Sequence, residues 1–135
     1  MEQNELPSKI TALYCRTATP DPAAIEKQRE ELLLYAAAHS FENVQIFEDD
    51  GFSGLSDARP DFTRMNELIA ARRVARVLTQ KISRISRNID AMLAWARMTQ
   101  KHGVKVITLD LGSMSELFVT MQDIYRIALE TGNSI

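Results

Sequence analysis

A cluster of cationic residues follows a short apolar run near the middle of the chain. Lys81, Arg84 and Arg87 recur every three residues, shortly after the apolar pair Val77 and Leu78. A guanidinium group can bind phosphate through two parallel hydrogen bonds, whereas an ammonium group acts as a point charge. Open α/β sheets bind ligands at the carboxyl ends of their strands. The stretch therefore predicts a phosphate-binding site, and nucleic acid is one source of such a phosphate.

Charge is distributed unevenly along this chain, whose net charge is only −2. Residues 21–57 hold nine acidic side chains against two basic ones, whereas residues 59–87 hold eight basic side chains against two acidic ones. This local surplus of six positive charges is typical of a surface that contacts a phosphate backbone. For Arg72, Arg73 and Arg76, a solvated helix face with ion pairs is an equally good interpretation.

The composition is that of a globular domain, with 45% hydrophobic and 25% charged residues in a chain of 135. No apolar run approaches the roughly 20 residues that span a bilayer, and the polar stretch Met1–Ser8 does not resemble a signal peptide. With a single cysteine, Cys15, the chain cannot form a disulfide framework, so we expect a cytoplasmic protein. One Cys and two His at no ligand spacing argue against zinc, and we expect no metal or cofactor.

Apolar runs alternate with helical patterns, and this alternation predicts the elements that position the cationic residues. We expect strands at 10–15, 44–48, 75–79 and 104–109, and helices at 22–39, from 60 onward, 89–101 and 115–130. Such an order predicts an α/β fold with a mostly parallel sheet of four to five strands and helices on both faces.

The loops after the first three strands are expected to meet at one edge of this sheet. They would gather Arg16, Asp50, Arg59, Arg84 and Arg87 around one point. Four guanidinium groups with one carboxylate require further negative charge, which either a phosphate or the acidic side chains of residues 21–57 can supply. Arginines also stabilise the charge that develops on phosphorus during phosphoryl transfer.

Five short motifs follow one another along the chain. They are Tyr14–Arg16, Glu26–Glu30, Asp49–Gly54, Arg59–Phe62 and Ser83–Asn88. In their order and spacing over residues 10–128 they resemble the catalytic domain of serine recombinases, the family of resolvases, invertases and large serine integrases. The alternative is an unrelated phosphate-binding domain with a flavodoxin-like sheet, in which the order of the motifs is a coincidence.

The resemblance implies a mechanism and a set of site residues. In the family, a serine hydroxyl attacks a DNA phosphodiester and forms a 5′-phosphoserine link. The cut ends then exchange by subunit rotation within a tetramer, and no metal or nucleotide cofactor takes part. Carried over to this chain, the phosphate-binding arginines are Arg16, Arg59, Arg84 and Arg87. The acidic residue of the second loop is Asp50, and the supporting positions are Tyr14, Gln28 and Ser53.

Two positions depart from the family pattern. The first motif of the family reads Tyr-x-Arg-x-Ser, and Ala18 stands where that nucleophilic serine belongs. The fourth motif reads Asp-Arg-x-x-Arg, and Ser83 stands in place of its aspartate. Loss of a nucleophile lowers turnover by on the order of 10⁶-fold, so we expect no DNA cleavage. Thr17 and Thr19 flank Ala18. Neighbouring side chains on an extended loop point in different directions, so neither threonine is expected to replace the serine.

We expect a disordered tail at 1–8, the resolvase-like catalytic domain at 9–112, and the start of a dimerisation helix with a tail at 113–135. Leu117, Met121, Ile124 and Ala128 recur in steps of four, three and four, which is typical of a coiled-coil seam. This seam predicts a homodimer or tetramer through residues 114–130, unless the helix folds onto its own sheet. We expect no DNA-binding domain, so contact with the DNA backbone should be weak. The alternative function is a regulatory module that pairs with an active recombinase.

Overall fold

Five strands form one sheet in the computed structural model, which describes residues 8–56, 58–110 and 112–113. The order across the sheet is β2-β1-β3-β4-β5. The strands are β1 (Ile10–Thr17), β2 (Val44–Asp50), β3 (Val74–Thr79), β4 (Lys105–Thr108) and β5 (Gly112–Ser113). The first four are parallel, whereas β5 runs antiparallel to β4. The predicted α/β fold with a mostly parallel sheet is confirmed.

Three α-helices and one short 3₁₀ helix connect the described strands. They are α1 (Pro22–Ala38), α2 (Pro60–Ala70), the 3₁₀ helix η1 (Ile82–Arg84) and α3 (Ile89–Lys101). Local chemistry sets where α1 and α3 begin, because the side chains of Asp21 and Asn88 accept hydrogen bonds from the first turn of each helix. None of the described helices is both long and apolar enough to cross a membrane.

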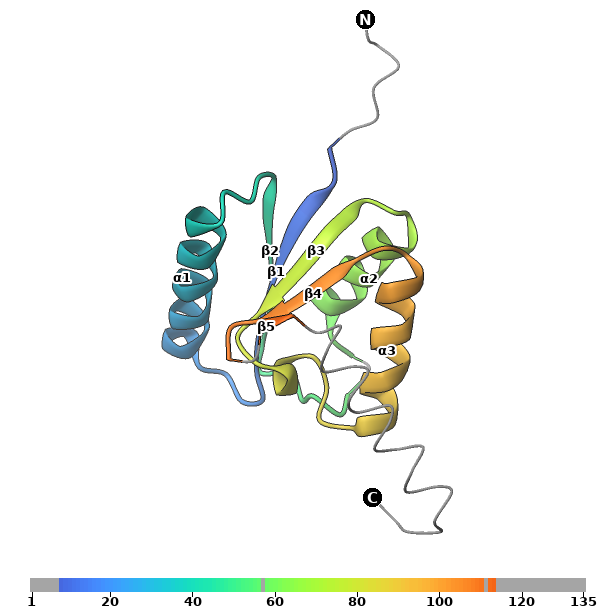
Figure 1. Cartoon of the computed structure of the whole chain (residues 1–135). Helices are drawn as coiled ribbons and strands as arrows, with labels where there is room; N and C mark the ends of the chain where they lie inside the picture. The colour runs from blue at the N-terminus through green and yellow to red at the C-terminus, as the bar shows by residue number, and fades with distance from the viewer. Residues whose placement is uncertain (1–7, 57, 111, 114–135) are drawn as a thin grey trace, which may run out of the picture.

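The helices cover both faces of the sheet (Figure 1). On one face, α1 buries Ile25 and Leu32 against Leu13 of β1. On the other, α2 and α3 pack on the strand residues that point the opposite way, including Ala12 and Tyr14. Because successive side chains of a strand alternate between faces, the central strand β1 contributes to both cores.

β1 and β2 each extend two residues beyond the strands that the sequence predicts. Arg16 and Asp50 lie in these extensions. Arg16 pairs with Asp49, and Thr17 pairs with Asp50, so all four belong to strands rather than to loops. The parallel ladder continues because it satisfies backbone groups that would otherwise be buried without partners. The predicted helix at 115–130 and most of the predicted tail at 1–8 lie outside the described residues.

Candidate phosphate-binding site

The carboxyl ends of β1, β2 and β3 lie side by side, and the segments that follow them converge. Arg16 is the penultimate residue of β1, while Arg59 ends the loop after β2. Arg84 and Arg87 lie between β3 and α3. The sheet order β2-β1-β3 therefore brings together segments that lie far apart in the sequence.

Arg16 is almost completely buried and holds two of these loops. Its Nη1 donates to the Phe52 carbonyl at 2.9 Å. Its Nη2 donates to the Ser83 carbonyl at 2.6 Å, and its Nε donates to the Arg84 carbonyl at 2.9 Å. Each guanidinium nitrogen of Arg16 is thus bound to a backbone oxygen, so the side chain determines the path of the loops around it.

Arg59 is also buried, and it fixes the same cationic loop from the other side. Its Nη1 donates to the Ile85 carbonyl at 2.6 Å, and its Nη2 donates to the Arg84 carbonyl at 3.0 Å. The guanidinium carbon lies 3.8 Å from the centre of the Phe62 ring, a favourable cation–π geometry. Arg16 and Arg59 together bind the backbone of three consecutive residues, 83–85.

Tyr14 links Arg59 to a buried carboxylate. Its hydroxyl accepts hydrogen bonds from Nε and Nη2 of Arg59, at 3.2 and 2.9 Å, and donates to Asp49 at 2.7 Å. Burial, together with this bond to Asp49, holds the pKa of Tyr14 above its usual range, so the hydroxyl keeps its proton. The charge of Arg59 is therefore balanced by Asp49 through one phenol group.

Asp49 also belongs to the site, although the sequence motifs indicate Asp50 and not Asp49. Besides Tyr14, its carboxylate accepts hydrogen bonds from the backbone N–H groups of Asp61 and Phe62, at 3.0 and 2.9 Å. It thereby caps α2, whose own N-cap residue, Arg59, makes no side-chain capping bond. One signal was available, since a helix that begins at Pro60 behind an arginine needs an acceptor from elsewhere.

Arg84 keeps a donor free. Its Nη1 donates to the Arg16 carbonyl at 3.1 Å, and its Nη2 donates to Oε1 of Gln80 at 3.3 Å. Its Nε is buried and, within the part of the chain that the structure describes, has no hydrogen-bond partner. A buried N–H without an acceptor is costly, so this nitrogen retains an unused capacity to donate a hydrogen bond.

The four guanidinium groups form one electrostatic cluster. Burial lowers the pKa of Arg16, and the charges of Arg59, Arg84 and Arg87 lower it further. Burial and Arg87 likewise lower the pKa of Arg84. The ion pairs among the described residues, Arg29–Glu48 and Arg64–Asp61, do not involve these four arginines. The cluster therefore favours a bound anion.

Gly54 permits the close packing of this cluster. A Cβ atom at this position would lie 2.8 Å from Nη2 of Arg16 and 2.9 Å from Cγ of Arg87. The backbone N–H of Arg87 also approaches the Gly54 carbonyl at 3.5 Å. The second glycine of the loop is therefore required by its neighbours rather than by its own backbone conformation.

Asp50 does not contact the arginine cluster. Its Oδ1 accepts hydrogen bonds from the Thr17 hydroxyl at 2.5 Å and from the Asp21 backbone N–H at 2.7 Å. The Thr17 hydroxyl also accepts from the Gly51 backbone at 3.0 Å. Asp50 and Thr17 thus brace the exposed turn that contains Ala18, and the threonine hydroxyl is already engaged there.

The remaining predicted positions have structural contacts. Gln28 bonds to both backbone groups of Arg16, accepting from its N–H and donating to its carbonyl, each at 3.1 Å. Ser53 accepts from the Leu55 N–H at 3.1 Å within a turn, and Ser83 contributes its carbonyl to Arg16. Burial, followed by the charge of Glu48, raises the pKa of Cys15 to about 12, which makes the thiol unreactive.

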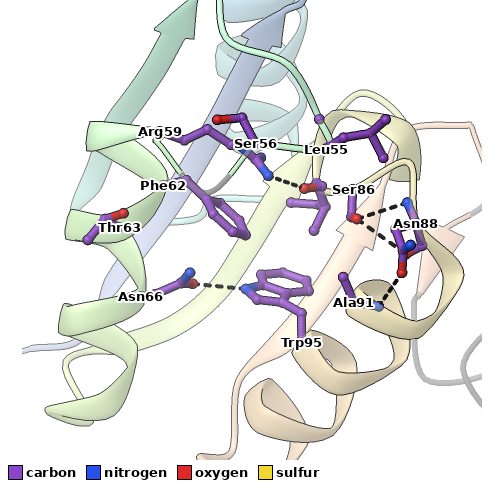
Figure 2. Close-up of a pocket in the computed structure, with 12 residues that line it drawn as sticks. Leu55, Ser56, Arg59, Phe62, Thr63, Asn66, Ser86, Asn88, Ala91 and Trp95 are labelled. Atoms are coloured by element: carbon purple, nitrogen blue, oxygen red, sulfur yellow. Dashed lines mark hydrogen bonds between the residues drawn. The ribbon is translucent and has the colours of Figure 1, made fainter.

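A pocket of about 710 Å³ adjoins the cluster between α2 and α3 (Figure 2). Phe62, Ile85 and Trp95 form apolar parts of its lining, and Trp95 donates from its indole nitrogen to Asn66 at 2.9 Å. Arg59 lines this pocket, but Arg16, Arg84 and Arg87 do not. The pocket is therefore lined by one of the four arginines of the cluster. Among the described residues, no group of His, Cys, Asp and Glu is arranged to hold a metal ion.

Comparisons with known proteins agree with this geometry. The family described as "Resolvase, N terminal domain" matches residues 11–129. The N-terminal catalytic domain of TP901-1 integrase is 26% identical, with a TM-score of 0.83 over 92% of this chain and 99% of that one. A resolvase family site-specific recombinase from Streptococcus pneumoniae is 27% identical, with a TM-score of 0.75 over 92% and 90% of the two chains.

A third solved structure covers less of both chains. The C-terminal catalytic domain of ISC1926 TnpA, an IS607-like serine recombinase, is 25% identical, with a TM-score of 0.68 over 74% of this chain and 68% of that one. No curated protein sequence matches the chain.

Proposed function

This chain belongs to the resolvase N-terminal domain family, and we propose on that basis that it binds a DNA phosphodiester without being able to cleave it. The observation that carries the proposal is the arginine cluster, which has a buried free donor on Arg84 and an exposed second cation on Arg87. Phosphate oxygens are among the acceptors that guanidinium groups bind strongly.

The four arginines divide the work. Arg84 and Arg87 contact the phosphate, since the donors of Arg16 and Arg59 are largely bound to backbone carbonyls and to Tyr14. Arg16 and Arg59 hold the loop that carries the other two. Asp50 braces the turn at the position where the family has its nucleophile.

The absence of cleavage follows from the residue at position 18. Ala18 lies directly after β1 and is exposed at the edge where the loops converge, but it has no atom that can attack phosphorus. Thr17 cannot act in its place while its hydroxyl donates to Asp50. Ser83 adds a second departure, because it replaces the acidic residue of the family pattern with a neutral one.

A plasmid assay tests this proposal. Supercoiled DNA is incubated with the unaltered chain and with an Ala18→Ser variant, and covalent protein–DNA adducts are sought on a denaturing gel. We expect no adduct with the unaltered chain and an adduct with Ala18→Ser. Ala38→Ser, at an exposed alanine that ends α1, is the matched control. An adduct with the unaltered chain would contradict the proposal.

A second candidate function is pairing with another recombinase subunit. The apolar seam of Leu117, Met121, Ile124 and Ala128 in the predicted helix favours it, because this spacing is typical of helices that pair between subunits. Such a chain forms homodimers or tetramers, or joins an active relative and blocks its assembly. Light scattering of the chain alone, and mixed with a full-length active family member, tests this function. A strict monomer that does not bind the relative would exclude it.

A further inference from the structure

Gln80 occupies a connecting position between α1 and the cationic loop. It directly follows β3, and its carboxamide forms hydrogen bonds with one residue of α1 and one residue of the cationic loop. Its Nε2 donates to Oε1 of Glu31 on α1 at 2.8 Å, and its Oε1 accepts from Nη2 of Arg84 at 3.3 Å. A carboxylate on one helix is thereby connected to a guanidinium group on a distant loop through one neutral amide.

The chemistry of the two partners determines the orientation of the amide. Arginine can only donate and an ionised carboxylate can only accept, so the carbonyl oxygen of Gln80 must face Arg84 and its nitrogen must face Glu31. If the amide were reversed, its NH₂ group would face the donors of Arg84 and its oxygen would face the carboxylate of Glu31. Glu31 therefore fixes the direction in which Gln80 presents its oxygen.

Arg84 is held on two sides by these contacts. The Arg16 carbonyl binds Nη1, and this carbonyl is itself fixed by Gln28, three residues before Glu31 on α1. Gln80 binds Nη2. Residues three apart on a helix lie on the same side, so one side of α1 supports both contacts. With the two Nη atoms held, the buried Nε has a fixed direction.

We propose that Gln80 and Glu31 are positioning residues that orient the Arg84 guanidinium toward a phosphate, an inference that rests on the proposed function. A carboxylate in direct contact with Arg84 would orient it equally well but would neutralise its charge. The amide of Gln80 supplies the acceptor and leaves the positive charge available to the ligand. Preorganisation of this kind improves binding because less side-chain freedom is lost when the anion arrives.

Nuclear magnetic resonance of the full chain labelled with ¹⁵N tests the orientation directly. The Nε–H signal of Arg84 is assigned by its disappearance in Arg84→Lys. We expect a sharp signal that exchanges slowly in the unaltered chain, and a broadened, faster-exchanging one in Gln80→Ala and Glu31→Ala. Glu31→Gln should restore the signal, because its amide oxygen can still accept the Gln80 N–H. Gln45→Ala, at an exposed glutamine near the opposite end of β2, is the matched control.

Binding of a short DNA duplex at low salt, followed by fluorescence anisotropy, tests the consequence. Gln80→Ala and Glu31→Ala should weaken binding by about threefold to tenfold, the effect of one hydrogen bond, while Glu31→Gln should bind as the unaltered chain does. An unchanged Arg84 signal and unchanged affinity in Gln80→Ala would overturn the inference, even if the variant melts at a lower temperature. If the unaltered chain does not bind the duplex, the proposed function fails, and the Arg84 signal still decides whether Gln80 and Glu31 orient this side chain.

Discussion

Individual arginines in this site do different work although the sequence presents them alike. Arg16 and Arg59 are buried and donate to backbone carbonyls of residues 83–85, whereas Arg84 keeps a free Nε and Arg87 is exposed. The motif spacing placed all four together, but it could not separate them, because the partners are backbone atoms that no motif specifies. The same limit explains why the motifs indicate Asp50 and not Asp49, whose partners are backbone N–H groups and Tyr14.

Removing the Tyr14 hydroxyl should reveal the energetic role of the Arg59–Tyr14–Asp49 chain. Tyr14→Phe removes the hydroxyl that accepts hydrogen bonds from the buried Arg59 guanidinium and donates one to the buried Asp49 carboxylate. We expect the free energy of unfolding to fall by about 2–3 kcal/mol, measured by urea denaturation. Tyr35→Phe, at a half-buried tyrosine of α1, should change it by less than about 1 kcal/mol. Equal effects of the two substitutions would contradict a stabilising role of the hydrogen bonds that join Arg59, Tyr14 and Asp49.

The buried thiol predicts a pH dependence of stability. Because the pKa of Cys15 rises from 9.0 to about 12 on folding, the unfolded chain releases this proton first. The protonated thiol makes its full contribution to the free energy of unfolding below pH 9.0, and this contribution is lost as the pH rises toward 12. Within that window it lowers the free energy of unfolding by about 1.4 kcal/mol per pH unit. Urea denaturation at several pH values should show a shallower decline for Cys15→Ala, and identical slopes would contradict the shift.

At the scale of elements, the sequence predicted each α-helix and strand around the site, but not where β1 and β2 end. Proline with a capping residue marks the start of α1, and Asn88 marks the start of α3, because those signals are local. The last two residues of β1 and β2 are strand only because they pair with each other. Buried parallel strands lack the alternating pattern that would reveal such pairing.

The start of α2 depends on Asp49 rather than on a local cap. Asp49→Asn keeps the shape of the side chain but removes the charge that accepts two backbone N–H groups and the Tyr14 hydroxyl. We expect it to destabilise the fold by about 1–3 kcal/mol in urea denaturation. Asp90→Asn, at an exposed position in the first turn of α3, should cost only a few tenths of a kcal/mol. A similar small cost at both positions would show that α2 is not capped by Asp49.

At the scale of the whole molecule, positive charge collects at one edge of the sheet although the chain is net acidic. The sequence predicted this grouping from the motif spacing and not from the surplus of basic residues between 59 and 87, because Arg72 and Arg73 of that surplus precede β3 at its amino end. It could not predict that α1 supports the cluster from the opposite face of the sheet, because Gln28 and Glu31 reach it only in the folded chain.

The affinity for DNA should therefore fall steeply with salt. We expect weak binding of duplex DNA. The logarithm of the association constant should decline linearly with the logarithm of salt concentration, with a slope of about 0.9 per phosphate contacted. Arg84→Ala should reduce the magnitude of that slope by about one, because one contact is lost. Arg73→Ala, at an exposed arginine before β3, should leave it unchanged. Affinity that does not respond to salt would show that the arginines are paired internally.

We propose that the chain retains a phosphate site and lacks the hydroxyl that would attack the phosphate, because position 18 is an alanine. Mass spectrometry of the Ala18→Ser plasmid reaction, after digestion with a nuclease and a protease, tests this proposal because it locates any nucleotide that remains covalently attached to a peptide. We expect a nucleotide attached at position 18 in the variant and none attached to any residue of the unaltered chain. A nucleotide on Thr17, Thr19 or any other residue of the unaltered chain would contradict it.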